Sequence, residues 1–299
     1  MTKQKFATLF SACALFCLAA GRPAFSDDYM VTGLKGIDNQ LYTLTFNPQP
    51  PPPNLSSLNL IGTDLTTGNT QTMSGFTLAE HYQSLAGFTA LPGRTFASSS
   101  YYSGTVYLYL FGATVQTLKV SGLPTAGSYI TALVGLKDGT LLALVNPRNG
   151  GNSGFFLETL NLQSAEATDT GFPFPSDRSF SGLTQCPDGT IYALASGSNY
   201  SKSLVQLDLN QQQVVEGPTL GQSGQRPIST RSLACSPQGD LLVEGVRNAD
   251  ANAGEGSFLP PDLFSVNKNS GELTTVSQPF NYAGGITFVP TRAGWKKPK

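Results

Sequence analysis

The chain has 299 residues and a mass of 31.6 kDa, with 39% hydrophobic residues, 12% charged residues and a formal net charge of −1. This composition argues against a disordered chain, which combines low hydrophobicity with high net charge. The near-zero net charge offers no bulk attraction to nucleic acid or anionic lipid. The length suits one large all-β domain.

Residues 1–26 have the anatomy of a secretory signal peptide. Lys3 and Lys5 form a basic start, residues 6–20 form an apolar run, and residues 24–26 (AFS) form a small-x-small cleavage signal. The run is shorter than the roughly 20 residues of a membrane span. We therefore expect cleavage before Asp27, a mature chain without a transmembrane segment, and a periplasmic or extracellular location.

Three segments of the mature chain repeat with a strict period. They are ALVGLKDGTLLALV (132–145), GLTQCPDGTIYALA (182–195) and SLACSPQGDLLVEG (232–245), and they align without a gap. Leu133, Leu183 and Leu233 consequently lie 50 residues apart. Looser copies occupy 33–46 and 87–100, and GGITFVP at 284–290 begins the pattern again.

Each repeat contains four expected strands. An apolar strand leads to a Pro-Asp-Gly-like turn and a second, alternating strand such as 190–194, which is typical of a hairpin. Third strands are expected at 106–110, 156–162, 204–209 and 263–266, and a weaker fourth strand at 273–276. Four strands at a period near 50, separated by Gly-rich turns, describe one blade of a β-propeller.

The chain resembles the β-propeller superfamily over residues 29–291, particularly exported bacterial propellers with a G-L-x3-P-D-G-x-L-Y core. We expect an all-β propeller of five blades, with six as the alternative, each of four antiparallel strands. The segment 286–289 is expected to close the ring and remove the exposed edges. The propeller would form one domain over 27–292, followed by a short basic tail at 293–299. A β-sandwich competes, but it does not explain the period.

The resemblance implies that first strands line a central channel and that ligands favour the channel mouth and its loops. Aromatic and basic residues precede or begin each first strand. In this register they would converge at one mouth: Tyr29, Tyr82, Tyr129, Arg178 with Phe180, Arg231 and Tyr282. Tyr and Arg are enriched at binding hot spots. The alternative is that the tyrosines cap inner strands with their hydroxyls in water.

Loops between second and third strands are expected on the same face. They span 47–57, 98–104, 146–154, 196–202 and 247–261, and their candidate binding residues are Tyr101, Arg148, Tyr200 and Arg247. Loops rich in Asn, Ser, Gly and Tyr resemble adaptable binding surfaces, and they are equally ordinary as solvated turns. In the longest loop Asp250, Asn252 and Glu255 are a candidate calcium site, with a solvated loop as the alternative.

The sequence lacks the residues that nucleophilic catalysis and metal binding usually need. His81 is the only imidazole, and the chain has no G-x-S-x-G elbow, phosphate loop or dinucleotide fingerprint. We therefore expect no cofactor. Carboxylate-only chemistry stays open, although Asp138, Asp188 and Asp240 lie at inter-strand turns, where turn formation is their simplest role.

The mature chain keeps two cysteines, Cys186 and Cys235, in first strands of adjacent blades. They precede the turn glycines Gly189 and Gly239 by three and four residues, so strand alternation directs their side chains to opposite faces. A disulfide needs Cα atoms within about 7 Å, and this offset disfavours one without a local bulge. Export still permits one. Two buried thiols are expected.

These observations predict an exported, non-enzymatic propeller that acts as a protein-binding scaffold or a peripheral subunit of a membrane-associated complex. The expected partner is an exported or membrane-associated protein, or else a glycan, and not a nucleic acid. One alternative is a carboxylate-based hydrolase or lyase, which requires two acids near Tyr129 and Arg231. Another is a purely structural surface protein that self-associates.

Overall fold

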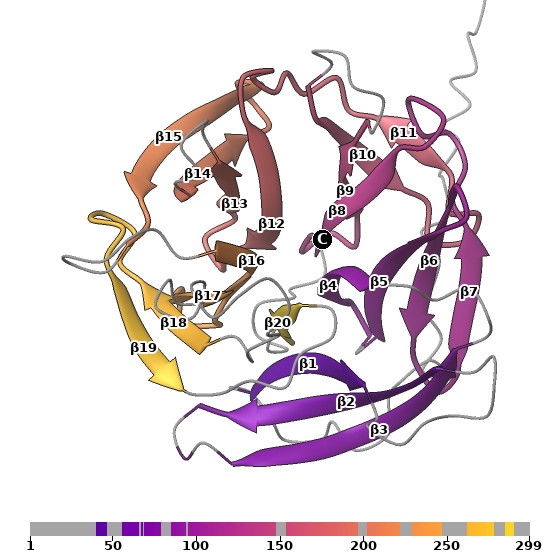
Figure 1. Ribbon diagram of the computed structural model, residues 1–299, viewed down its shortest axis with the longest axis horizontal. Coiled ribbons are helices and arrows are strands. Elements are labelled where there is room, and N and C mark those ends of the chain that lie inside the picture. The colour runs from indigo at the N-terminus through magenta and orange to yellow at the C-terminus, as the bar shows by residue number, and fades with distance from the viewer. Residues whose placement is uncertain are drawn as a thin grey trace, which may run out of the picture.

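The computed structural model consists of five four-stranded antiparallel sheets arranged around a central axis (Figure 1). It describes residues 40–46, 56–65, 67, 69–78, 85–93, 95–147, 154–196, 202–221, 229–246, 262–277 and 285–289. The strands, in chain order, are β1 (Gln40–Phe46), β2 (Ser56–Asp64), β3 (Thr70–Leu78), β4 (Leu85–Leu91), β5 (Thr95–Tyr102), β6 (Thr105–Phe111), β7 (Val115–Lys119), β8 (Tyr129–Gly135), β9 (Leu141–Asn146), β10 (Phe156–Leu160), β11 (Ala167–Asp169), β12 (Ser179–Gln185), β13 (Ile191–Ser196), β14 (Lys202–Asp208), β15 (Gln213–Thr219), β16 (Ser229–Cys235), β17 (Leu241–Val246), β18 (Asp262–Val266), β19 (Leu273–Ser277) and β20 (Ile286–Phe288). The chain is a five-bladed β-propeller, as the sequence predicts.

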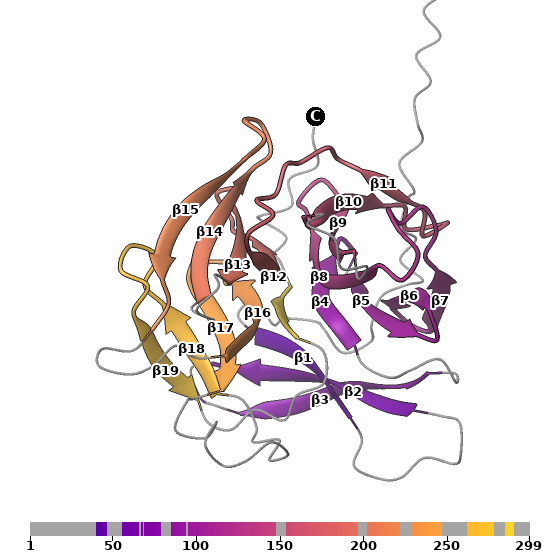
Figure 2. The ribbon, with the colours of Figure 1, turned by 45° about the horizontal axis from the view of Figure 1, so that its top comes forward.

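The first blade is built from segments at the two ends of the described chain. Its strand order is β20-β1-β2-β3, so β20 is the innermost strand, and Figure 2 shows it beside β1 and β16. Leu41 lies opposite Phe288, and the Thr43 hydroxyl donates a hydrogen bond to the Gly285 carbonyl at 2.9 Å. The other four blades each use four consecutive strands. Closure of the ring by the last strand confirms the prediction made from the final repeat.

The hairpin that joins first and second strands has a recurring turn. Its glycines adopt left-handed φ values of 92°, 95° and 94° in three blades, at Gly139, Gly189 and Gly239. Glycine adopts this left-handed region readily because it has no Cβ atom. The amide of Thr190 donates to the Asp188 carboxylate at 2.9 Å, and this hydrogen bond lowers the carboxyl's pKa. Asp138 accepts the Thr140 amide in the same way, so both aspartates shape turns as expected.

Apolar side chains fill the wedges between neighbouring blades. Between the first two blades, the Phe96 ring lies 5.4 Å from Tyr42 and stacks on Phe88 at 5.2 Å, measured between centroids. Strand side chains alternate between the two sheet faces, so each sheet contributes to the wedges on both of its sides. Burial in these wedges removes apolar surface from water and holds each blade against the next.

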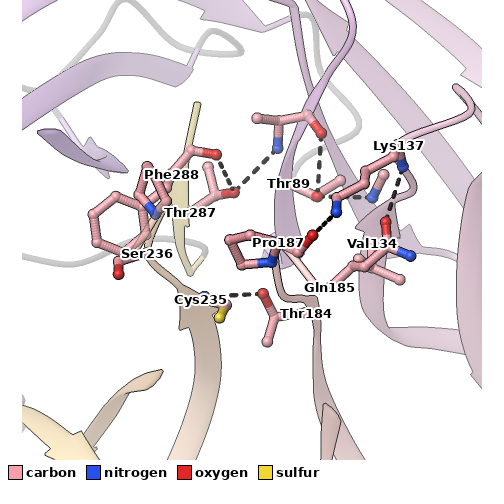
Figure 3. Close-up of a pocket in the computed structure, with 13 residues that line it drawn as sticks. Thr89, Val134, Lys137, Thr184, Gln185, Pro187, Cys235, Ser236, Thr287 and Phe288 are labelled. Carbon is pink, nitrogen blue, oxygen red and sulfur yellow. Dashed lines mark hydrogen bonds between the residues drawn. The ribbon is translucent and has the colours of Figure 1, made fainter. Parts of the chain in front are cut away.

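Hydrogen bonds from backbone amides to side-chain oxygens join the inner strands of neighbouring blades (Figure 3). In three cases a threonine hydroxyl accepts an amide proton from the following blade. These bonds are Ala90 N to Thr287 Oγ1 (3.2 Å), Gly135 N to Thr89 Oγ1 (2.9 Å) and Cys235 N to Thr184 Oγ1 (3.0 Å).

The other two blade boundaries use different acceptors. The amide of Lys137 donates to the Gln185 side-chain carbonyl, and the amide of Ile286 donates to the Ser232 hydroxyl, each at 2.9 Å. The Lys137 ammonium also donates to the Pro187 carbonyl. Every boundary of the five-bladed ring therefore has at least one such bond, which sets the register of the inner strands.

Cys186 and Cys235 form a disulfide with Cα atoms 5.2 Å apart, so the expectation of two thiols is wrong. Cys186 lies beyond the end of β12, in the turn, where its amide donates to the Thr190 carbonyl. Strand alternation therefore does not set its direction. The β-bulges of the two inner strands lie before both cysteines, between Ser181 and Leu183 and between Thr230 and Ser232, so they do not account for the offset. The disulfide joins the fourth and fifth blades.

The segment 98–104, expected as a loop, belongs mostly to β5, which continues to Tyr102. Buried serines are compatible with this strand because the neighbouring inner strand β4 offers acceptors at its bulge. The Ser98 hydroxyl donates to the Gly87 carbonyl and the Ser99 hydroxyl to the Ala86 carbonyl, both at 2.7 Å. The polar side chains that suggest a loop therefore satisfy backbone groups inside the sheet.

Candidate functional site

Two cavities lie at opposite ends of the inner strands. A cavity of about 540 Å³ opens near the strands' N-terminal ends, and one of about 90 Å³ lies near their C-terminal ends. Thr89, Thr184 and Thr287 of the inter-blade hydrogen bonds surround the smaller cavity (Figure 3). We take the larger one, called here the wide-mouth cavity, as the candidate site because small-molecule sites usually measure 300–1,000 Å³.

Small residues at one repeat position of the inner strands line the wide-mouth cavity on the side of the central axis. They are Gly87, Ala132, Gly182, Ser232 and Gly285, one from each blade. A Cβ on Gly87 would lie 2.5 Å from the backbone nitrogen of Leu133, and Gly87 has a φ of 65°. In this blade the close approach of the neighbouring inner strand and the left-handed φ therefore require glycine at position 87, whereas the equivalent positions 132 and 232 carry alanine and serine.

Tyr101 and Tyr129 meet in the wide-mouth cavity from adjacent blades. Their ring centroids are 6.2 Å apart and the rings are nearly edge-to-face, at 62°. Tyr129 begins the inner strand β8, and Tyr101 is the penultimate residue of β5. Both are half-buried, and both line the cavity. The structure thus brings together two of the residues that the sequence proposed for this mouth.

Lys202 also lines the wide-mouth cavity and was not among the sequence candidates. It begins β14, the third strand of the fourth blade, and its ammonium donates to the Ser181 hydroxyl of the inner strand β12 at 3.2 Å. Burial lowers the pKa of this ammonium, because desolvation disfavours the charged form. A single lysine at the edge of a polar loop gives no sequence signal that would distinguish it from a solvated residue.

Arg178 and Phe180 take other positions. The Arg178 guanidinium contacts both carboxylate oxygens of Glu216 on the outer strand β15, at 2.7 and 2.8 Å. This interaction raises the pKa of Arg178. Phe180 is buried, with its ring centroid 4.7 Å from that of Phe174.

The remaining sequence candidates are only partly covered by the structure. Arg231 lies in β16 at the bulge between Thr230 and Ser232. Outside the described residues lie Tyr29, Tyr82, Tyr282, Arg148, Tyr200 and Arg247, together with the calcium candidates Asp250, Asn252 and Glu255.

No Asp or Glu of the described residues lines the wide-mouth cavity. The same part of the chain has no group of three or more His, Cys, Asp or Glu residues that could hold a metal ion. Two glutamates, Glu158 of β10 and Glu244 of β17, are buried within their blades. Burial, with a contribution from Asp169, raises the pKa of Glu158 to about 7. Among the described residues, no helix is both long and apolar enough to cross a bilayer.

Comparisons with known proteins return propeller-containing structures at low similarity. TolB from Acinetobacter baumannii is 15% identical, with 85% of this chain and 58% of that chain covered and a TM-score of 0.45. A puromycin-hydrolyzing peptidase from Mycobacterium tuberculosis is 13% identical, with 80% and 38% covered and a TM-score of 0.43. The gluconolactonase XC5397 from Xanthomonas campestris is 11% identical, with 77% and 74% covered and a TM-score of 0.45.

The chain thus spans less than two thirds of the TolB and peptidase chains. No family model matches the sequence, and no curated protein matches it.

Proposed function

We propose that the protein is an exported, non-catalytic propeller that binds a partner protein through the face carrying the wide-mouth cavity. The observation that carries this proposal is the difference between the two ends of the inner strands. One end has a cavity of about 540 Å³ with two adjacent tyrosines, whereas the cavity at the other measures about 90 Å³. Rigid, amphipathic tyrosine rings are favourable anchors for a partner.

Export is supported by two independent features. Residues 1–26 have the three parts of a signal peptide, which would leave a mature propeller domain over 27–292. The Cys186–Cys235 disulfide fits an oxidising compartment such as the periplasm or the extracellular medium. In such a compartment the protein would act as a scaffold or as a peripheral subunit of a membrane-associated complex.

Site-specific photo-crosslinking in the native host tests this proposal. A photoreactive phenylalanine analogue replaces Tyr129 in the cavity, and a matched variant carries it at Val215 on β15, where the native side chain is 38% exposed. We expect the Tyr129 position to give a discrete adduct of higher mass than the 31.6 kDa chain and the Val215 position to give none. The proposal would be overturned if the protein migrated as a free monomer on a native gel and the Tyr129 position gave no adduct.

A further inference from the structure

We propose that the wide-mouth cavity binds a carboxylate group, held by the Lys202 ammonium and the Ser181 hydroxyl, with the apolar body of the ligand against the cavity's aliphatic and aromatic walls. This inference rests on the proposed function, because it names the chemistry that a partner would present to the site. It concerns the ligand group alone and is testable without knowledge of the partner.

The first observation is the unbalanced charge of Lys202. Its ammonium has three donor protons, and within the described residues its one hydrogen bond goes to Ser181 and it forms no ion pair. No carboxylate of those residues lines the cavity. A partly desolvated ammonium is stabilised by an opposite charge, so an anion entering the cavity would offset the cost of its burial. The two remaining protons are available to the two oxygens of a carboxylate.

The second observation is the small number of polar groups around that charge. The described lining supplies one ammonium and a few hydroxyls, of which the Ser232 hydroxyl already accepts the Ile286 amide. A phosphate dianion is usually held by several donors or by a guanidinium fork. One ammonium beside one hydroxyl matches the single charge of a carboxylate.

The third observation is the apolar character of the rest of the wall. Ile130, Leu133 and Leu183 line the cavity together with the rings of Tyr101 and Tyr129. An aliphatic or aromatic body joined to the carboxylate would remove this surface from water, which is favourable. The site therefore fits an amphipathic acid rather than a small, fully hydrated anion.

A titration followed by NMR tests the carboxylate directly. The mature chain is labelled with ¹³Cε-lysine, and the Lys202 signal is assigned by its loss in Lys202→Met. Hexanoate is the probe, and hexanamide and inorganic phosphate are the matched comparisons. We expect hexanoate to shift the Lys202 signal saturably with a Kd on the order of 1 mM, and the two comparison compounds to shift it at least tenfold less. No saturable shift with hexanoate, or an equal shift with hexanamide, overturns the inference.

Two further variants separate the site from general charge effects. Ser181→Ala should weaken hexanoate binding at least threefold because it removes the hydroxyl beside the ammonium. Lys119→Met removes the same charge from an exposed position on β7 and should leave hexanoate binding unchanged. Equal weakening by Lys119→Met and Ser181→Ala would contradict a defined site.

The source of the carboxylate is distinguished with two peptides of the same length. One has a free C-terminal carboxylate, and the other is amidated and carries an internal glutamate. Binding of either supports the inference and identifies the source. A Tyr129 crosslink that persists while hexanoate fails to bind would leave the partner proposal standing and remove this one. Hexanoate binding without any crosslink would leave the carboxylate site standing and remove the partner-protein proposal. The ligand would then be a free organic acid.

Discussion

The amide of Gly135 donates a hydrogen bond to the Thr89 hydroxyl, 2.9 Å away and 46 residues earlier in the chain. The two residues belong to the inner strands of successive blades, which do not pair with each other as a sheet. One short side chain thereby satisfies a backbone donor that has no strand partner there and fixes the relative position of two blades. The same geometry joins Thr184 to the amide of Cys235.

We predict that Thr89→Val lowers the free energy of unfolding by about 1–3 kcal/mol, because valine has a similar shape and leaves the part-buried Gly135 amide without its acceptor. Thr117→Val is the matched control, since Thr117 is exposed on β7. Urea denaturation of both variants measures the difference. Equal losses in the two variants would show that the inter-blade bond contributes nothing specific.

Reduction of the Cys186–Cys235 disulfide should destabilise the ring at the boundary between the fourth and fifth blades. The bond spans 49 residues, and the loop-entropy relation gives roughly 4 kcal/mol for a loop of this size. Thermal unfolding with and without dithiothreitol should therefore show a lower Tm in reductant. The double variant Cys186→Ala, Cys235→Ala should unfold at the lower temperature in both conditions, and a response of that variant to dithiothreitol would contradict the assignment.

Gly87→Ala should be much more destabilising than Gly171→Ala. Both glycines have left-handed φ values, 65° and 72°, so alanine carries a similar backbone penalty of about 1–2 kcal/mol at each. A Cβ at position 87 would also meet the Leu133 nitrogen at 2.5 Å, whereas at position 171 nothing lies within 4 Å. Chemical denaturation of the pair isolates the steric contribution, and similar losses would argue against tight contact between the inner strands.

Stability should fall between pH 4.5 and about 7 because of Glu158. Burial raises the pKa of this carboxyl from 4.5 to about 7, so the folded state retains a proton that the unfolded state has released in this range. The contribution of protonated Glu158 to the free energy of unfolding is complete below pH 4.5 and is lost as the pH rises through the pKa of the folded state. Glu158→Gln should remove this part of the pH dependence.

At pH 8 the same variant should be more stable than the wild type, by about 1–3 kcal/mol, because it no longer buries a charge. Urea denaturation across the pH range measures both effects. Identical pH profiles for the variant and the wild type would place the titration elsewhere.

Much of the fold could be predicted from the sequence because the propeller repeats one physical unit. The left-handed turn at Gly139, Gly189 and Gly239 recurs at the same spacing, and each turn fixes the register of a hairpin. The closing strand was also predictable, since 284–290 restarts the pattern without completing a blade. The threonines at positions 89, 184 and 287 recur at the same repeat position, but their hydroxyls bond between blades, which a pattern within one blade does not reveal.

The candidate site was predictable only in part. Tyr101 and Tyr129 share a cavity as the register implies, whereas Arg178 is paired with Glu216 on an outer strand. The direction of an arginine before a strand depends on neighbouring charges that sequence spacing does not locate. Lys202 was missed because its importance comes from burial. The disulfide was missed because alternation was extended past the last residue of β12 into a turn.

Placement of β20 inside the first blade has a consequence for how the protein reaches its final state. The contact between Thr43 and Gly285 joins residues 242 positions apart, and contacts of such long sequence separation form slowly. Until the last strand arrives, the other blades form an open arc whose inner edge at β1 is unpaired. Synthesis of the chain as far as β20 must therefore precede ring closure, and until then the edge of β1 is open to pairing with neighbouring chains.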